Sequence, residues 1–202
     1  MITIYNFRRG ARGVRVCWVC EEMELPYRAE AVTFPPSEAY LKLNRLGTVP
    51  FLTDEGGVAI NESIAMILYL AERYGPTTLM PAKNDPMFAR ALQAIVFAEA
   101  SLGAGMNTLM AAKFAAPDAD KRNWSVRSQE GRVEQYIGFA ADMLGDKPYF
   151  AGETFTLADV CMATAFAMWR GALDKTLPPG LAAFQERATA RPAYQRARQT
   201  QS

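Results

Sequence analysis

The sequence predicts an α/β domain followed by an all-helical domain. An alternating apolar run, an amphipathic stretch and a second alternating run predict a strand, a helix and a strand at the start of the chain. Two short apolar runs around a Gly-rich turn predict a hairpin further along. Strand patterns stop after Pro81, and helical periodicity takes over. We therefore expect a mixed sheet with helices on both faces in residues 1–78, a linker at about 79–85, and a helical domain in 86–202.

Composition limits the classes of function. The 202 residues carry a net charge of +1, which argues against a nucleic-acid surface built on overall basicity. The first residues lack the basic and apolar regions of a secretory signal. The longest apolar run, 160–169, is too short to span a bilayer, so neither nucleic acid nor membrane is an expected partner. Three cysteines, an odd number, do not suggest a disulfide framework, and we expect a reducing, cytoplasmic location.

The sequence contains no histidine. This excludes Ser-His-Asp catalysis, Cys-His catalysis and every metal site that needs a histidine ligand. Three cysteines without histidine also argue against a four-ligand zinc site, so we expect no metal. Acid–base or nucleophilic chemistry must come from other side chains or from a bound cofactor.

The first domain opens with a strand over residues 2–5, where apolar and mixed residues alternate. A helix follows over about 13–23 and ends before Pro26. Residues 27–32 alternate as a second strand, which a right-handed crossover makes parallel to the first. A loop then leads to a short helical stretch at about 40–43.

A hairpin and a capped helix complete this domain. Proline offers no N–H to a sheet, so it suits the first position of a third strand over 50–53. A Gly-rich turn returns the chain as a strand over 58–60. Asn61 and Ser63 then offer caps for a helix that ends near Tyr74.

The segments around Val49 and Ser63 suit a small zwitterionic peptide. The residue before a proline is biased towards extended backbone, so Val49 can pair its N–H and C=O with a peptide-like ligand. The first N–H groups of a helix have no internal partner, so the amide of Ser63 can hold a carboxylate. Glu62 can meet an ammonium group on the same ligand. An ordinary hairpin followed by a capped helix is the alternative interpretation.

Cys17 and Cys20 form a C-x-x-C close to the strand–helix–strand pattern, which can indicate a redox pair. Redox thiolates are found at helix N-termini, whereas these two cysteines lie inside an apolar helix. Buried packing is therefore the interpretation that we favour.

Four arginines lie near the start of the first helix. Arg8, Arg9, Arg12 and Arg15 would combine with the helix N-terminus to make a positive potential, which would stabilise a thiolate or a carboxylate. Tyr5, at the end of the first strand, could point its hydroxyl into the same space. A solvated arginine loop and a half-buried strand aromatic are the alternatives.

The second domain should consist of helices with apolar residues at helical spacing. Thr156 and Asp159 form a capping box for the most apolar of them, which should lie at the centre of this domain. The expected helices run from Pro86 to the glycines at 103 and 105, over 133–144, over 157–169, over 181–188, and for a short distance after Pro192.

The chain resembles cytosolic glutathione transferases of the bacterial type over nearly its whole length. Residues 47–52 (GTVPFL) and 61–65 (NESIA) are similar to the family's Val-Pro and Glu-Ser glutathione motifs. Residues 156–159 (TLAD) resemble the capping box of its helical domain, and 190–197 (ARPAYQRA) resemble its terminal signature. The order and spacing of the four motifs make the resemblance specific.

This resemblance implies a thioredoxin-like N-terminal domain, an all-helical C-terminal domain and a homodimer. It implies a cis peptide bond between Val49 and Pro50, and glutathione as co-substrate. The glutathione-binding residues would be Thr48, Val49 and Pro50 at the cysteinyl part and Glu62 with Ser63 at the γ-glutamyl end. The other substrate would be a small hydrophobic electrophile, and detoxification the role.

The resemblance also implies a catalytic residue. Gly10 and Ala11 occupy the region where many bacterial members have serine or cysteine, so no hydroxyl or thiol is available there. Tyr5 followed by Arg9-Gly10 instead resembles the tyrosine-type members. Tyr5 is therefore the implied thiol-activating residue, with Arg9 and Arg12 as auxiliaries.

A substrate pocket would lie between the two domains. Its candidate lining residues are Phe7, Met106, Met110, Phe166 and Trp169, for which plain core packing is the alternative. Three other functions remain open: a non-catalytic protein that binds glutathione or a hydrophobic ligand, a thiol–disulfide oxidoreductase, and a glutathione-dependent isomerase, lyase or peroxidase.

Overall fold

The computed structural model describes residues 1–8 and 12–200 of the chain. It divides into two compact units: unit 1 is Met1–Thr77 with Thr189–Ser202, and unit 2 is Thr78–Ala188. The last part of the chain, which we expected in the helical domain, therefore groups with the sheet. The reason is a set of contacts between the first and the last helix.

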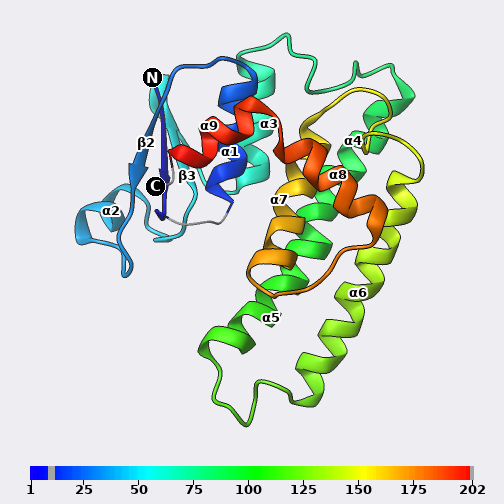
Figure 1. Cartoon of the computed structure of the whole chain (residues 1–202). Coiled ribbons are helices and arrows are strands. Elements are labelled where there is room, and N and C mark those ends of the chain that lie inside the picture. The colour runs from blue at the N-terminus through cyan, green and yellow to red at the C-terminus, as the bar shows by residue number, and fades with distance from the viewer. Residues whose placement is uncertain (9–11, 201–202) are drawn as a thin grey trace. The chain divides into compact units, whose positions relative to one another are not determined.

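The sheet of unit 1 contains β1 (Ile2–Asn6), β2 (Tyr27–Ala31), β3 (Phe51–Asp54) and β4 (Val58–Ile60). The strand order is β2-β1-β3-β4 (Figure 1). β1 and β2 are parallel, while β1 with β3 and β3 with β4 are antiparallel. The predicted mixed sheet, with its crossover and its hairpin, is confirmed.

Within the described part of unit 1 the α-helices are α1 (Gly13–Glu22), α2 (Glu38–Leu43), α3 (Ser63–Arg73) and α9 (Pro192–Gln199). A short 3-10 turn, Glu55–Gly57, joins β3 to β4. Figure 1 shows α1 and α3 on one face of the sheet and α2 on the other. This is the thioredoxin-like arrangement that the resemblance implies.

Helix α1 is the most deeply buried element of unit 1. Its residues from Val16 to Cys20 are all fully buried. Ile4 from β1 and Leu52 from β3 are fully buried too, as are three residues of α3. A helix that is apolar nearly all round must be covered on most sides, and α9 supplies part of that cover.

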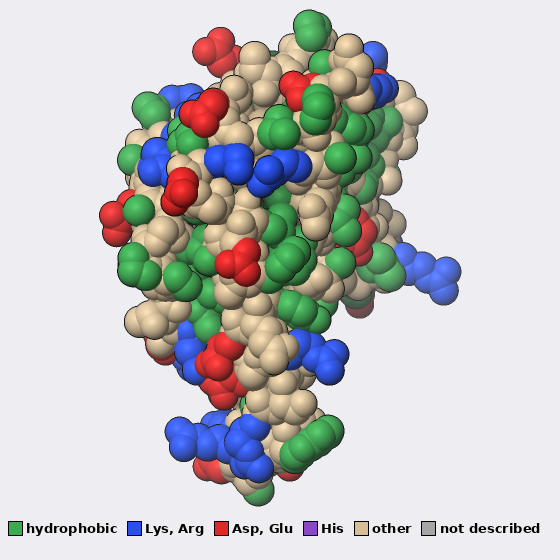
Figure 2. Space-filling view, turned by 90° about the vertical axis from the view of Figure 1, so that its right-hand side faces the viewer, with side chains coloured by type: hydrophobic (Ala, Val, Ile, Leu, Met, Phe, Trp, Pro, Cys, Tyr) green, Lys and Arg blue, Asp and Glu red, His purple; other side chains and the backbone are tan. Residues whose placement is uncertain are grey.

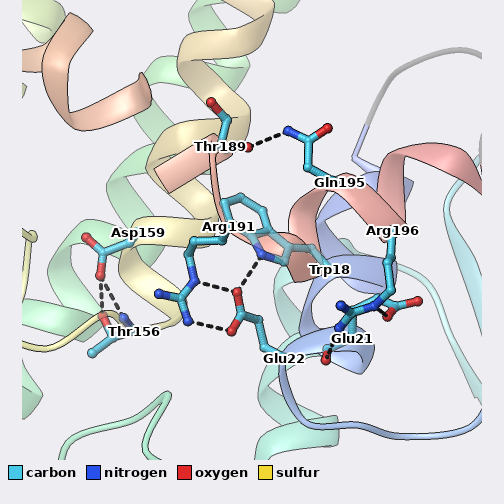
Figure 3. Close-up of polar contacts among 9 residues, drawn as sticks. All are labelled: Trp18, Glu21, Glu22, Thr156, Asp159, Thr189, Arg191, Gln195 and Arg196. Atoms are coloured by element: carbon cyan, nitrogen blue, oxygen red, sulfur yellow. Dashed lines mark hydrogen bonds and ion pairs between the residues drawn. The ribbon is translucent and has the colours of Figure 1, made fainter. Parts of the chain in front are cut away.

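Helix α9 brings two arginines to the acidic C-terminal end of α1 (Figure 3). Arg191 donates from Nε and Nη2 to the two carboxylate oxygens of Glu22, at 2.6 and 2.7 Å. Arg196 donates from Nε to Glu21 Oε2 at 2.6 Å. Carboxylates at a helix C-terminus are unfavourable on their own because of the helix dipole. The arginines neutralise these two carboxylates and so offset that cost.

Trp18 completes this contact between α1 and α9. Its indole N–H donates to Glu22 Oε1 at 2.9 Å, and its ring packs edge-on against Tyr194 with centroids 4.7 Å apart. The contact is stabilised because a large aromatic ring is buried while its indole N–H keeps a hydrogen-bond partner. We call Trp18, Glu21, Glu22, Arg191, Tyr194 and Arg196 the α1–α9 clasp.

Unit 2 is helical. Helix α7 lies at its centre, with Leu157–Phe166 buried throughout, as its apolar sequence predicts. The helices of this unit are α4 (Pro86–Phe97), the π-helical segment η2 (Ala98–Gly103), α5 (Ala104–Ala115), α6 (Trp124–Leu144), α7 (Leu157–Gly171) and α8 (Pro179–Thr189).

Two helix boundaries differ from the sequence prediction. The helix that begins at Pro86 does not end at the glycines but continues through η2 and α5. Gly105 instead allows α5 to pack closely against α6, because a Cβ at this position would lie 2.6 Å from Val133 Cγ2. Helix α6 begins earlier than predicted because Asn123 caps it, accepting the Val126 N–H at 3.1 Å.

The capping box of α7 is confirmed. Asp159 is fully buried and accepts the Thr156 N–H at 2.7 Å and the Phe150 N–H at 2.8 Å (Figure 3 shows the Thr156 contact). Burial raises the pKa of Asp159 to about 6, against the lowering effect of these hydrogen bonds. The box therefore fixes the start of the central helix of unit 2.

By length and composition alone, one helical stretch within the described residues, Pro86–Ala115, could cross a bilayer; its mean hydropathy is 1.3. Core helices of water-soluble proteins meet the same criterion, and 44% of the apolar window is buried. The stretch is therefore weak evidence for a membrane segment.

Candidate functional site

The loop before β3 is fixed by α2. The Thr48 carbonyl accepts two hydrogen bonds, from Tyr40 Oη at 2.6 Å and from Asn44 Nδ2 at 2.8 Å. The Val49–Pro50 bond that follows is cis. Among the described residues, no hydrogen-bond partner is found for the main chain of Val49. Val49 lies in a bend rather than in a strand, and main-chain groups without an internal partner can pair with a peptide.

Glu62 and Ser63 lie at the start of α3, where the first amides have no partner within the helix. Glu62 precedes the helix with φ of 69°, a left-handed conformation that is costly for a residue with a side chain. Such strain persists where the surrounding structure enforces it, and it is frequent at ligand sites.

Arg15 from α1 fixes Ser63. Both side chains are buried, and Arg15 Nη1 donates to Ser63 Oγ at 2.8 Å. Arg15 is therefore not part of an exposed arginine cluster, as the sequence suggested. It joins α1 to α3 and brings positive charge to the start of α3. Its position inside an apolar helix was the available signal that it would be buried.

The other arginines of that cluster have different places. Arg8 is exposed, and Arg12 is the residue that precedes α1, half-buried and without a side-chain cap on the helix. Arg9 lies outside the described residues. The structure thus leaves the auxiliary roles of Arg9 and Arg12 as predictions.

Tyr5 is half-buried and lies on the face of the sheet that carries α2. Its ring centroid is 5.9 Å from that of Tyr40 and 5.9 Å from that of Phe51, its cross-strand neighbour. Tyr40 in turn binds the Thr48 carbonyl. Tyr5 also lines a cavity of about 260 Å³ with residues of β2 and α2. Tyr5, Tyr40 and Phe51 therefore form one aromatic cluster, which the Tyr40 hydroxyl joins to the loop before β3.

Asn6 is a candidate that the sequence analysis missed. It follows Tyr5 in β1, so its side chain points to the opposite face, which carries α1. Asn6 is only 4% exposed, and its amide lies against Gly13, where a Cβ would come within 2.1 Å of Asn6 Cγ. An amide at the start of α1 could orient an anion there. The alternation of β1, with Ile4 on the same face, was the signal that could have found it.

The cysteine pair is packed in the core. Cys17 and Cys20 are both fully buried, and neither forms a disulfide. Burial raises the pKa of the Cys17 thiol to about 11 and raises that of Cys20 further. A redox pair needs an accessible, ionised thiol, so the packing interpretation is confirmed.

The candidate substrate-pocket residues divide into two groups. Met106, Phe166 and Trp169 are buried inside unit 2. Phe7 and Met110 are half-buried, and the Phe7 ring packs edge-on against that of Phe34 in unit 1. Met106, Phe166 and Trp169 thus have the burial expected of core residues. Phe7 and Met110 are partly exposed, so a substrate could contact them.

The described residues include no cluster of three or more Cys, Asp or Glu side chains arranged to hold a metal ion. Unit 1 offers a loop in which the main chain of Val49 has no described partner, a helix N-terminus with a buried arginine, and a phenol near the same loop. This set of groups suits a small peptide that carries a carboxylate and a thiol.

The family models and the relatives that match this chain all belong to one family. Residues 13–73 match the family model described as the glutathione S-transferase N-terminal domain, and residues 104–192 match that of the glutathione S-transferase C-terminal domain. Glutathione S-transferase 1 of Schizosaccharomyces pombe is 26% identical over 191 residues, covering 91% of this chain and 81% of the relative. Glutathione S-transferase GstB of Escherichia coli is 23% identical and covers 97% of both chains.

Solved structures agree with the fold. The glutathione transferase of Methylococcus capsulatus superposes with a TM-score of 0.86 at 24% identity, covering 100% of this chain and 98% of the other. The theta class glutathione S-transferase of Xanthomonas axonopodis pv. citri, solved with glutathione bound, has a TM-score of 0.81 and 26% identity, covering 97% and 96% of the two chains.

Proposed function

The chain belongs to the glutathione S-transferase family, and from this premise we propose that it binds glutathione on unit 1 and activates its thiol for attack on a hydrophobic electrophile. The observation that carries the proposal is the buried Arg15–Ser63 hydrogen bond at the start of α3, beside strained Glu62. It provides a fixed anchor for a carboxylate, next to an acidic group for an ammonium.

In this proposal glutathione lies along the loop before β3. The Val49 main chain pairs with the cysteinyl part, within the segment that Thr48 and Pro50 hold in place. The Ser63 amide and hydroxyl bind the γ-glutamyl carboxylate, and Glu62 binds the ammonium group. Hydrogen bonds to charged groups in such sites contribute about 1.5–3 kcal/mol each.

Calorimetry with glutathione tests the binding site. Ser63→Ala should weaken binding by about tenfold or more, since one charge-assisted contact is lost. Ser125→Ala, at an exposed serine of α6, is the matched control and should leave the affinity unchanged. Absence of any heat with millimolar glutathione in the wild-type protein would refute the proposal.

Tyr5 is proposed to hold the thiolate by donating its hydroxyl hydrogen bond, with Arg9 and Arg12 adding positive charge. A free thiol with a pKa of about 8.5 is only about 3% ionised at pH 7, and lowering that pKa by about two units requires roughly 2.7 kcal/mol. A phenol hydrogen bond together with positive charge near a helix N-terminus can supply this amount.

Steady-state conjugation of chlorodinitrobenzene as a function of pH tests Tyr5. Tyr5→Phe should move the pH midpoint upwards and lower the rate at pH 7 by about tenfold to a hundredfold. Tyr149→Phe, which removes the same hydroxyl group from a tyrosine of unit 2, is the matched control. An unchanged pH profile for Tyr5→Phe would remove Tyr5 from this role, and Asn6 would be the next residue to substitute.

The acceptor is proposed to be a small hydrophobic electrophile, with Phe7 and Met110 as the lining residues that remain partly accessible. Met106, Phe166 and Trp169, which are buried in unit 2, would contribute through core packing alone. Phe7→Ala and Met110→Ala should raise KM for the electrophile and leave that for glutathione unchanged.

A homodimer is proposed to form through the α4–α6 face of unit 2. Val96 is 53% exposed and Phe139 45% exposed, and Phe139 stacks edge-on with Phe97 at 5.3 Å. Figure 2 shows hydrophobic side chains gathered on the side of the molecule where α4 and α6 lie. Exposed apolar patches of this kind mark interaction sites.

Light scattering after size-exclusion chromatography tests the dimer. Phe139→Glu should give a monomer, while Phe114→Glu, at a residue that is 67% exposed outside this face, should not. A cytoplasmic location and a role in detoxification are part of the same proposal, and three cysteines without a disulfide support the location. Fractionation of the producing cells tests the location.

A further inference from the structure

The end of unit 2 at which α5 stops and α6 begins forms a projecting tip. Residues 116–123 join the two helices, and Figure 1 shows this turn extending beyond the ends of α7 and α8. We call residues 113–127 the α5–α6 tip. Because the tip projects from its own unit, its side chains can meet a flat surface without any movement of another helix of that unit.

Two large aromatic side chains are exposed at the tip. Trp124, the first residue of α6, is 75% exposed, and Phe114, near the end of α5, is 67% exposed. The described residues contain no hydrogen-bond partner for the indole N–H of Trp124. Tryptophan, whose ring is apolar and whose N–H needs a partner, is enriched at the interface between membrane and water. Both rings are therefore placed to contact something outside the unit.

Cationic side chains accompany these aromatic rings. The charged residues of the tip are four cations and two aspartates: Lys113, Lys121, Arg122, Arg127, Asp118 and Asp120. Figure 2 shows lysine and arginine side chains gathered at the lower end of the molecule, where α5 and α6 are joined. The tip is therefore positively charged, although the net charge of the whole chain is only +1.

Most of these cations can meet an external anion. Lys121 pairs with Asp118 at 2.8 Å, but Asp118 is 95% exposed, and an ion pair of this kind contributes little. Arg127 donates from Nη1 to the Arg122 carbonyl at 2.6 Å, and the described residues contain no partner for the guanidinium of Arg122. Lys113 is the exception, because an ion pair and a carbonyl hold it on the segment after α7.

An anionic lipid bilayer is the partner that fits this combination. Exposed aromatic rings gain free energy when they enter the headgroup region, and the cations gain it from the lipid phosphates. Proteins that bind single-stranded nucleic acid hold such residues in a groove, whereas this surface projects. The expectation of no membrane partner rests on the lack of a spanning segment, and a surface that lies on a bilayer needs none.

We propose that the α5–α6 tip docks reversibly on the surface of a bilayer that contains anionic phospholipids. Trp124 and Phe114 enter the headgroup region, while Lys121, Arg122 and Arg127 contact the lipid phosphates. Peripheral binding of this kind agrees with the cytoplasmic location proposed above, because the cytoplasmic leaflet has a negative surface potential. The proposal does not depend on glutathione chemistry.

Fluorescence titration of the full chain with lipid vesicles tests the proposal. Trp18 and Trp169 are buried whereas Trp124 is exposed, so a blue shift of the emission on binding reports the tip. Vesicles of equal parts phosphatidylcholine and phosphatidylglycerol should cause this shift and sediment with the protein. Vesicles of phosphatidylcholine alone should bind about tenfold more weakly, and added salt should weaken binding to the anionic vesicles.

Substitutions separate the contribution of the ring from that of the charges. Trp124→Ala should weaken sedimentation with the anionic vesicles about tenfold, whereas Trp124→Phe should keep most of the binding and lose the blue shift. Lys121→Gln combined with Arg122→Gln should weaken binding about tenfold or more, since each cation near an anionic surface contributes about fivefold. Lys83→Gln combined with Arg132→Gln removes two exposed cations elsewhere in unit 2. This matched control should weaken binding less than about twofold.

Three results would overturn the proposal: no sedimentation with anionic vesicles at low salt, equal binding to phosphatidylcholine vesicles, or equal losses in the tip and control double variants. A single-stranded oligonucleotide that displaces the protein from vesicles, and whose binding is lost in Trp124→Ala, would assign the tip to nucleic acid and overturn the proposal as well. All these variants change exposed side chains, and unchanged circular dichroism and urea midpoints confirm that they are folded.

Discussion

Replacing Arg191 with alanine should lower the unfolding free energy of unit 1 by about 2–3 kcal/mol, because Glu22 would lose its main charge partner while staying buried. Glu22 is 8% exposed and Arg191 34% exposed. Breaking a fully buried pair costs about 3–5 kcal/mol. Because the arginine is partly exposed, we expect a loss just below this range.

Arg196→Ala is the matched control in the same clasp. Arg196 is 52% exposed and its partner Glu21 is 19% exposed, so water can replace the lost contact. Its loss should lower the urea midpoint far less than the loss of Arg191, although both variants remove one arginine from the C-terminal segment that packs on α1.

Urea unfolding followed by tryptophan fluorescence and circular dichroism measures the difference. The double variant Arg191→Ala with Glu22→Gln should recover part of the loss, since no buried charge then remains. Equal midpoints for Arg191→Ala and Arg196→Ala, or no recovery in the double variant, would refute the reasoning.

Three further predictions concern other parts of the molecule. The pKa of Asp159 is about 6 when folded against an ordinary 3.8, so the folded chain holds this proton more tightly. Wild-type stability relative to Asp159→Asn should thus fall by roughly 3 kcal/mol between about pH 4 and pH 6; a pH-independent difference in urea unfolding would contradict this. Gly13→Ala places a Cβ 2.1 Å from Asn6 Cγ and should cost about 1–3 kcal/mol. Gly131→Ala, in open space on α6, should instead raise stability by up to about 1 kcal/mol in thermal unfolding. Cys17 should resist iodoacetamide in the native protein and react once unfolded, as mass spectrometry would show; fast native labelling would revive a redox role.

The sequence predicted those features whose partners lie close together in the chain. Thr156 and Asp159 are three residues apart, so the spacing alone predicts the capping box. The alternation of β1 and the turn before β4 are equally local. The proposed glutathione-binding region was predicted through a resemblance, because a proline, an acid and a serine in that order also suit an ordinary hairpin followed by a capped helix.

Other features depend on contacts that no local pattern contains. Arg191 and Glu22 are 169 residues apart, so the acidic end of α1 has no visible partner in its own part of the sequence. Gly105 looked like a helix end because its close neighbour, Val133, belongs to a different helix. Arg15 looked like a loop charge for the same reason, since its partner Ser63 comes 48 residues later.

The grouping of α9 with unit 1 has a consequence for synthesis of the protein. Unit 2 is one continuous piece of chain and is complete once Ala188 has left the ribosome. Unit 1 is started first, yet its largest buried aromatic, Trp18, has no cover from Tyr194 until the segment after Ala188 has emerged. A nascent chain therefore finishes its second unit before its first, and truncation near Arg191 should harm the part of the protein that was made earliest.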